Sequence, residues 1–136
     1  MAMSTDKKIR VLLAKSDMDA HDRAIRFVAE ILKDAGMEVI FIRYRIPQEV
    51  APIAIQEGVD VVALSFYSPG ALHETSIVMQ GLKDQGMNDV MVIVGGVIPP
   101  EDATELRQKG VAVFGPGRPI GELVECITSG RRAHSI

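Results

Sequence analysis

The chain of 136 residues has the length of one typical domain, with 47% hydrophobic residues and a formal charge of −3. Its apolar runs stay far below the ~18 residues that cross a bilayer, and residues 1–8 lack the apolar stretch of a signal peptide. We therefore expect a soluble, cytoplasmic protein that binds neither membrane nor, given its charge, nucleic acid. The single cysteine, Cys126, excludes an internal disulfide.

Five short runs rich in β-branched residues predict five strands separated by helical patterns. Near-continuous hydrophobicity is typical of strands that are buried on both faces of a sheet. The runs cover residues 9–14, 39–42, 59–64, 90–94 and 111–114.

Five helices are expected between and after these strands. The first and third end at Gly36 and Gly86, since glycine suits the left-handed position after a helix. The second is kinked or begins later than Pro47, because Pro52 would remove an internal hydrogen bond. The fourth opens at residues 99–102 and closes at Gly110, and the last runs from Pro119 to near Gly130.

Alternating strands and helices predict an α/β fold: one doubly wound, flavodoxin-like, Rossmann-type domain with a five-stranded parallel sheet in the order 2-1-3-4-5. The expected domain spans residues 9–130, with tails at 1–8 and 131–136. Ligands of such sheets bind beyond the carboxyl ends of the strands. The loops after Ala14, Leu64, Val94 and Phe114 are therefore the candidate site.

The charged loop after the first strand contains His21, the main candidate for a metal ligand. Asp19 lies two residues before it and is placed to orient the imidazole through its second nitrogen, and Lys15 can pair with Asp19. An Asp-x-His pair is short and frequent, so a surface histidine among solvated charges fits the spacing equally well.

Other sites known for this fold class fit the residues less well. Zinc takes three or four ligands, which one histidine and scattered carboxylates do not supply. A phosphorylated receiver domain needs an acceptor aspartate at the end of the third strand, where this chain has Ser65. A flavodoxin needs a phosphate-binding loop rich in Ser, Thr and Gly, and this loop is charged instead.

From residue 9 to about residue 127 the chain resembles the cobalamin-binding domain of acyl-CoA mutases, glutamate mutase and methionine synthase, and especially the small subunits of acyl-CoA mutases. The family signature is D-x-H-x-x-G, then S-x-L at the third strand and G-G at the fourth. This chain reads Asp19-Ala20-His21-Asp22-Arg23-Ala24, Ser65-Phe66-Tyr67 and Gly95-Gly96, with Leu12-Leu13-Ala14-Lys15 and Phe114-Gly115-Pro116-Gly117 typical of the mutase branch.

The resemblance implies base-off, histidine-on cobalamin, with His21 as the cobalt ligand and Lys15 and Asp19 as the relay behind it. The benzimidazole tail would lie between the loops after the third and fourth strands. Ser65 would hydrogen-bond the benzimidazole, and Gly95 and Gly96 would leave room for it. The implied cofactor-binding residues are Asp19, Ala20, His21, Asp22, Arg23, Ser65, Tyr67, Gly95, Gly96, Phe114, Gly115 and Pro116.

The chain departs from the signature mainly at Ala24, where the family has glycine. If that position needs a positive φ, alanine costs about 1 kcal/mol, and if it serves close approach to the corrin ring, one methyl forces a small shift. Ala20 and Tyr67 also replace the usual glycine and leucine.

The implied activity is a radical 1,2-rearrangement of an acyl-CoA with adenosylcobalamin, in which this chain is the cofactor-binding subunit of an isomerase and is inactive alone. A separate large TIM-barrel subunit would bind the acyl-CoA, and the resemblance implies that the two kinds of subunit assemble into a heterotetramer. Two alternatives remain: a corrinoid methyl carrier, and a cobalamin-sensing or degenerate module without a catalytic partner. The acyl-CoA substrate is not predicted, because the large subunit would select it.

Overall fold

Parallel strand pairing organises the chain in the computed structural model, which describes residues 8–18, 22–67, 69–115 and 118–135. The strands form one sheet in the order β2-β1-β3-β4-β5, and every neighbouring pair is parallel. This confirms the predicted flavodoxin-like order. The strands are β1 (Arg10–Ser16), β2 (Glu38–Tyr44), β3 (Val61–Phe66), β4 (Met91–Gly96) and β5 (Ala112–Phe114).

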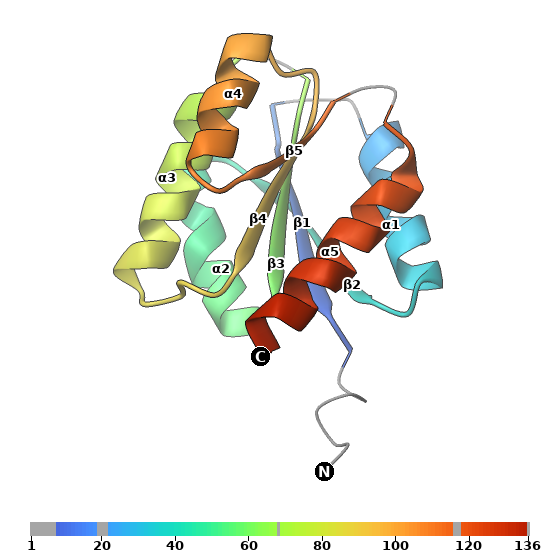
Figure 1. The fold of residues 1–136 in the computed structure, drawn as a ribbon. Helices are drawn as coiled ribbons and strands as arrows, with labels where there is room; N and C mark the ends of the chain where they lie inside the picture. Colours follow the sequence, from blue (N-terminus) through green and yellow to red (C-terminus); the bar gives the residue numbers. More distant parts are fainter. Residues whose placement is uncertain (1–7, 19–21, 68, 116–117, 136) are drawn as a thin grey trace.

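Helices cover both faces of the sheet (Figure 1). One face carries α1 (Arg23–Asp34) and α5 (Ile120–Ser135). The other carries the short 3-10 helix η2 (Pro47–Glu49), α2 (Val50–Glu57), α3 (Ala71–Asp84) and α4 (Pro100–Gln108). None of the helices in the described part of the chain combines the length and apolar character needed to cross a bilayer.

Successive side chains along each strand point to opposite faces of the sheet, so the buried side chains form two cores. Leu13, Ala63 and Ile93 pack toward α1 and α5, together with Leu32 and Ile127 from those helices. Their strand neighbours point to the opposite face and pack against α2, α3 and α4; they include Leu12, Ala14, Val62, Leu64, Val92 and Val94. The near-continuous apolar runs in the sequence therefore reflect burial on both faces.

Four strands extend two residues beyond the apolar runs that predicted them. The parallel ladder continues after the last residue of each run, so that β1 ends at Ser16, β2 at Tyr44, β3 at Phe66 and β4 at Gly96. The polar and glycine residues expected in loops therefore begin within the sheet, where neighbouring strands fix their positions.

The second helix begins later than Pro47, as predicted. Residues 47–49 form a 3-10 turn, and Pro52 is the third residue of α2. The first four N–H groups of a helix have no intrahelical partner, so proline removes no helical hydrogen bond there.

The last helix extends further than predicted, since α5 continues through Gly130 to Ser135. A Cβ added at Gly130 would lie 1.8 Å from the Cε atom of Met91, so this glycine serves close packing of the helix on β4. The prediction of a helix end near Gly130 was wrong because glycine also occurs where two elements approach closely.

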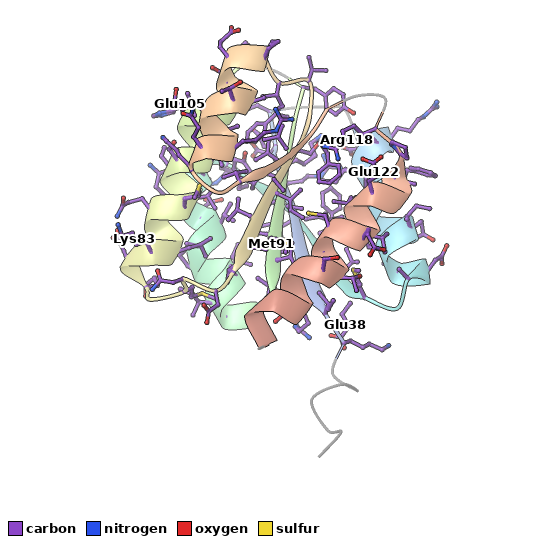
Figure 2. All side chains as sticks on the ribbon, in the orientation of Figure 1. Glu38, Lys83, Met91, Glu105, Arg118 and Glu122 are labelled. Carbon is purple, nitrogen blue, oxygen red and sulfur yellow. The ribbon has the colours of Figure 1, made fainter. Side chains whose placement is uncertain are left out.

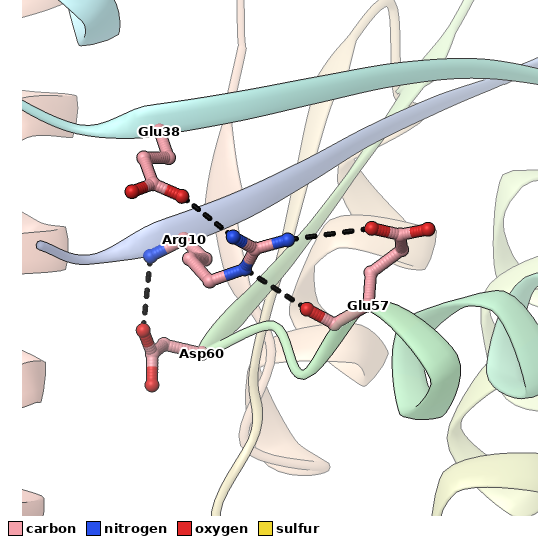
Figure 3. Close-up of polar contacts among 4 residues, drawn as sticks. All are labelled: Arg10, Glu38, Glu57 and Asp60. Atoms are coloured by element: carbon pink, nitrogen blue, oxygen red, sulfur yellow. Dashed lines mark hydrogen bonds and ion pairs between the residues drawn. The ribbon is translucent and has the colours of Figure 1, made fainter.

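At the amino end of the sheet, Arg10 ties four segments together (Figure 3). Its guanidinium donates to the carboxylate of Glu38 at 2.6 Å, to the carbonyl of Glu57 at 2.9 Å and to the carboxylate of Glu57 at 3.3 Å. Its backbone N–H donates to the carboxylate of Asp60 at 2.9 Å. This end lies opposite the candidate site.

We expect Arg10→Met to lower the free energy of unfolding by about 1 kcal/mol, because two carboxylates and a carbonyl lose a partly buried donor. Urea denaturation measures the change. Arg45→Met is the matched control, since Arg45 is 82% exposed and pairs with Glu49 at 3.7 Å. Equal stability of the two variants would contradict a stabilising role for the contacts of Arg10.

Candidate functional site

A row of residues crosses the carboxyl edge of the sheet on the face covered by α1 and α5. The strand register pairs Lys15 with Arg43 on one side and with Ser65 on the other. Ser65 pairs with Gly95, and Gly95 pairs with Phe114. Leu13, Ala63 and Ile93, two positions earlier on β1, β3 and β4, belong to the core beneath α1 and α5. Because every second side chain of a strand points to the same face, Lys15, Ser65 and Gly95 lie on that face too.

A cavity of about 500 Å³ opens beside this row. Its floor consists of sheet residues, and its walls come from α1, α5 and the loops after β3, β4 and β5. The described residues that line it are largely apolar: Leu13, Ala24, Ile25, Phe27, Val28, Ala63, Leu64, Ser65, Tyr67, Ile93, Gly95, Gly96, Val97, Phe114, Gly115, Arg118, Pro119, Ile120 and Leu123.

Lys15 is fully buried at the end of β1 and pairs with Asp22. Its Nζ atom donates to Oδ1 of Asp22 at 2.6 Å. Asp22 precedes the first residue of α1 and also binds Arg43 through Oδ2, with Arg26 at 3.7 Å. One carboxylate thus holds β1, β2 and α1 together beside the segment that contains His21.

The guanidinium of Arg43 and then the ammonium of Lys15 lower the pKa of Asp22 from 3.8 to about 2. The lowered pKa means that the ionised carboxylate stabilises the folded chain. That contribution is complete above the unfolded pKa near 3.8 and is lost as the pH falls toward 2.

We expect wild type to be more stable than Asp22→Asn at pH 6 and the difference to shrink steadily between pH 4 and pH 2. Urea denaturation at several pH values measures both chains. The amide keeps the shape of the side chain and removes its charge, so a difference that does not change with pH would contradict the ionic interaction.

The structure brings six of the predicted cofactor-binding residues to one cavity: Ser65, Tyr67, Gly95, Gly96, Phe114 and Gly115. Asp22 and Arg23 are not among its lining residues. Asp22 holds Lys15 instead, and Arg23 is exposed at the start of α1. The remaining predicted residues, Asp19, Ala20, His21 and Pro116, lie outside the described residues, so the Lys15-Asp19-His21 relay stays a prediction.

The two glycines at the end of β4 differ in what they require. A Cβ added at Gly95 would meet only the carbonyl oxygen of Phe114, at an ordinary 3.5 Å. Gly96 has a φ of +109°, and an added Cβ would lie 1.9 Å from the carbonyl oxygen of Phe66. Gly95 therefore leaves open space in the cavity, whereas the backbone itself requires Gly96.

Ala24, which replaces a signature glycine, is the second residue of α1. No residue other than glycine has a positive φ in the described part of the chain. Alanine therefore carries no backbone strain at this position, and its methyl group lies on the cavity wall.

Sequence reasoning missed most of the cavity wall, including Phe27, Val97 and Arg118. Phe27 and Val97 are 57% and 56% exposed although they are large and apolar. Nothing in the sequence distinguishes a helix residue that lines a cavity from one that packs against the sheet. Arg118 had no motif around it beyond the preceding glycine.

Comparison with known proteins identifies relatives over most of the chain. The family model described as the B12 binding domain matches residues 9–124. The 2-hydroxyisobutanoyl-CoA mutase small subunit of Aquincola tertiaricarbonis is 47% identical over 104 residues, which cover 76% of each chain. The pivalyl-CoA mutase small subunit of Xanthobacter autotrophicus is 40% identical over 128 residues, covering 90% of this chain and 84% of the relative.

A crystal structure of a cobalamin-binding protein from Desulfitobacterium hafniense superposes with a TM-score of 0.75 and 22% identity. The match covers 91% of this chain and 60% of the other. At this identity the superposition shows a common fold.

Proposed function

The chain belongs to the B12 binding domain family, and from this premise we propose that it is the cobalamin-binding small subunit of an acyl-CoA mutase. The observation that carries the proposal is the cross-strand row of Lys15, Ser65, Gly95 and Phe114 beside an apolar cavity. Two motifs of the family signature, Ser65-Phe66-Tyr67 and Gly95-Gly96, begin on this row. The relatives named as small subunits match along most of their own length.

The cavity suits the benzimidazole tail of cobalamin. Its volume of about 500 Å³ lies within the ~300–1,000 Å³ of typical small-molecule sites. Apolar walls fit a flat aromatic base, the hydroxyl of Ser65 offers it a hydrogen bond, and the absent side chain of Gly95 leaves space above the sheet. The exposed Phe27 and Val97 would be covered by a bound ligand.

His21 is the cobalt ligand in this proposal, with the base-off, histidine-on arrangement. Asp22, which directly follows it in the sequence, is anchored to the sheet edge through Lys15 and Arg43. This anchoring fixes the residue after His21 at the carboxyl edge of the sheet, the edge at which the cavity opens. Asp19 is proposed to orient the imidazole from its second nitrogen.

Adenosylcobalamin supplies the radical chemistry of the carbon-skeleton rearrangement through its cobalt–carbon bond. The residues of this chain would hold the tail and supply the histidine ligand to cobalt, and Lys15 beside them is buried from water. A separate TIM-barrel subunit is proposed to bind the acyl-CoA substrate, in a cytoplasmic heterotetramer. The names of the relatives as small subunits support a larger partner.

Electron paramagnetic resonance tests the cobalt ligand directly. The purified chain is titrated with cob(II)alamin, and spectra are recorded with ¹⁴N- and ¹⁵N-histidine. We expect coupling from one imidazole nitrogen, which changes from a triplet to a doublet on ¹⁵N labelling and disappears in His21→Ala.

His73→Ala is the matched control, because His73 is exposed on α3, on the opposite face of the sheet. It should keep the histidine coupling unchanged. Absence of coupling in wild type, or the same coupling in His21→Ala, would contradict the proposed ligand.

A further inference from the structure

Arg118 is the one charged side chain among the described residues that line the cavity. It lies two residues before α5, and its guanidinium stacks over the ring of Phe114, 4.3 Å from the ring centroid. Figure 2 shows Arg118 and Glu122 side by side near the start of α5. The largely apolar cavity thus has one charged group, a partly exposed guanidinium, among its described lining residues.

The contacts of Arg118 fix the position of its guanidinium and leave some of its N–H donors unused. Its Nε and Nη2 atoms donate to Oε1 of Glu122 at 3.0 and 2.7 Å, and Nη1 donates to the carbonyl of Val113 at 3.2 Å. These contacts use three of the five N–H donors that a guanidinium carries. The group is 44% exposed, so an anion can reach the remaining donors.

We propose that Arg118 binds the phosphodiester of the cobalamin nucleotide tail. This inference rests on the proposed function and adds the residue that recognises the charged part of the tail. The tail carries one phosphodiester outside its aromatic base, so a base inside an apolar cavity places a single negative charge toward the rim. Arginine binds phosphate oxygens through paired N–H donors, and here it lies at that rim.

A hydrogen bond to the carbonyl of Val113 on the edge strand β5 does not by itself explain why an arginine stands at position 118. The carbonyl of Val113 also accepts a hydrogen bond from Arg107 at 3.5 Å. Both arginines line a neighbouring groove, and Arg107 is not among the residues that line the cavity. Two arginines therefore share one carbonyl, and only Arg118 also faces the cavity, so Arg107 is a matched control.

The test compares cobalamin with cobinamide, which has the corrin ring but lacks the nucleotide tail. Binding of each to wild type, Arg118→Met, Arg118→Lys and Arg107→Met is measured by absorption titration. We expect Arg118→Met to weaken cobalamin binding about tenfold and cobinamide binding less than about twofold. Arg118→Lys keeps the charge and should stay within about threefold of wild type for cobalamin.

Each alternative gives a different pattern. If Arg118 only stabilises the fold, Arg118→Met weakens both corrinoids equally or neither, which overturns the inference. If its planar group stacks on the base instead, Arg118→Lys is as weak as Arg118→Met, which also overturns it. Arg107→Met should match wild type throughout, and an equal loss there would contradict the role of Arg118. Failure of wild type to bind cobalamin would reject the proposed function itself.

Discussion

Gly96→Ala should destabilise the chain by about 3 kcal/mol, the largest stability effect expected from a single methyl group here. The backbone at Gly96 has a φ of +109°, a conformation that L side chains rarely adopt. An added Cβ would also lie 1.9 Å from the carbonyl oxygen of Phe66, which accepts a hydrogen bond from Val97 at 2.9 Å. Relief of this clash requires the ends of β3 and β4 to move apart.

Gly110→Ala separates the two causes, because Gly110 has a φ of +88° and no atom within 4 Å of an added Cβ. Gly110→Ala should lower the free energy of unfolding by about 1 kcal/mol, because only the positive φ disfavours alanine there. Urea denaturation of both variants gives the difference, which reports the contact with Phe66. If the two variants lose equal stability, the close approach of β3 and β4 is not a constraint.

The fold could be predicted from sequence because its signals are local and repeated. Each strand appears as a run of β-branched residues, and right-handed connections leave few ways to order five parallel strands. The strand ends were placed too early because Lys15, Ser65 and Gly95 interrupt the apolar pattern while the ladder continues through them. Residues that serve a site are those for which hydrophobicity is a poor guide to structure.

The sequence predicted several individual residues of the site but not their relative positions in space. Motifs identified Lys15, Ser65, Gly95 and Phe114 separately, whereas their alignment in one row depends on the register of four strands. A single sequence does not specify that register.

The ion pair between Lys15 and Asp22 shows a similar limit. Asp22 follows Lys15 by seven residues, and sequence spacing alone does not identify this pair. Asp22 pairs with Lys15 because it lies at the start of α1, where the helix carries it back to the end of β1. Only the packing of the helix on the sheet supplies this information.

Gly95 offers the most direct test of the cavity, since its side-chain position is open and faces the proposed tail. The nearest atom to an added Cβ is the carbonyl oxygen of Phe114 at 3.5 Å, an ordinary contact. The fold should therefore accept a side chain that the bound tail would not. A β-branched residue also suits the strand conformation at this position.

We expect Gly95→Ala to weaken cobalamin binding about tenfold and Gly95→Val about 100-fold, equivalent to roughly 1.4 and 2.7 kcal/mol of lost binding free energy. The free energy of unfolding should change by less than about 1 kcal/mol in either variant. Cobinamide, which lacks the tail, should bind both variants as it binds wild type. Absorption titrations and urea denaturation measure the two quantities on the same samples.

Gly121→Ala is the matched control for this series, because Gly121 is exposed on α5, has no atom within 4 Å of an added Cβ and does not line the cavity. It should bind both corrinoids like wild type. The graded loss at Gly95 follows from the volume that each side chain removes beside Ser65, so affinity must fall in the order Gly, Ala, Val. Unchanged cobalamin binding by Gly95→Val would place the tail elsewhere and would remove the cross-strand row from the binding site.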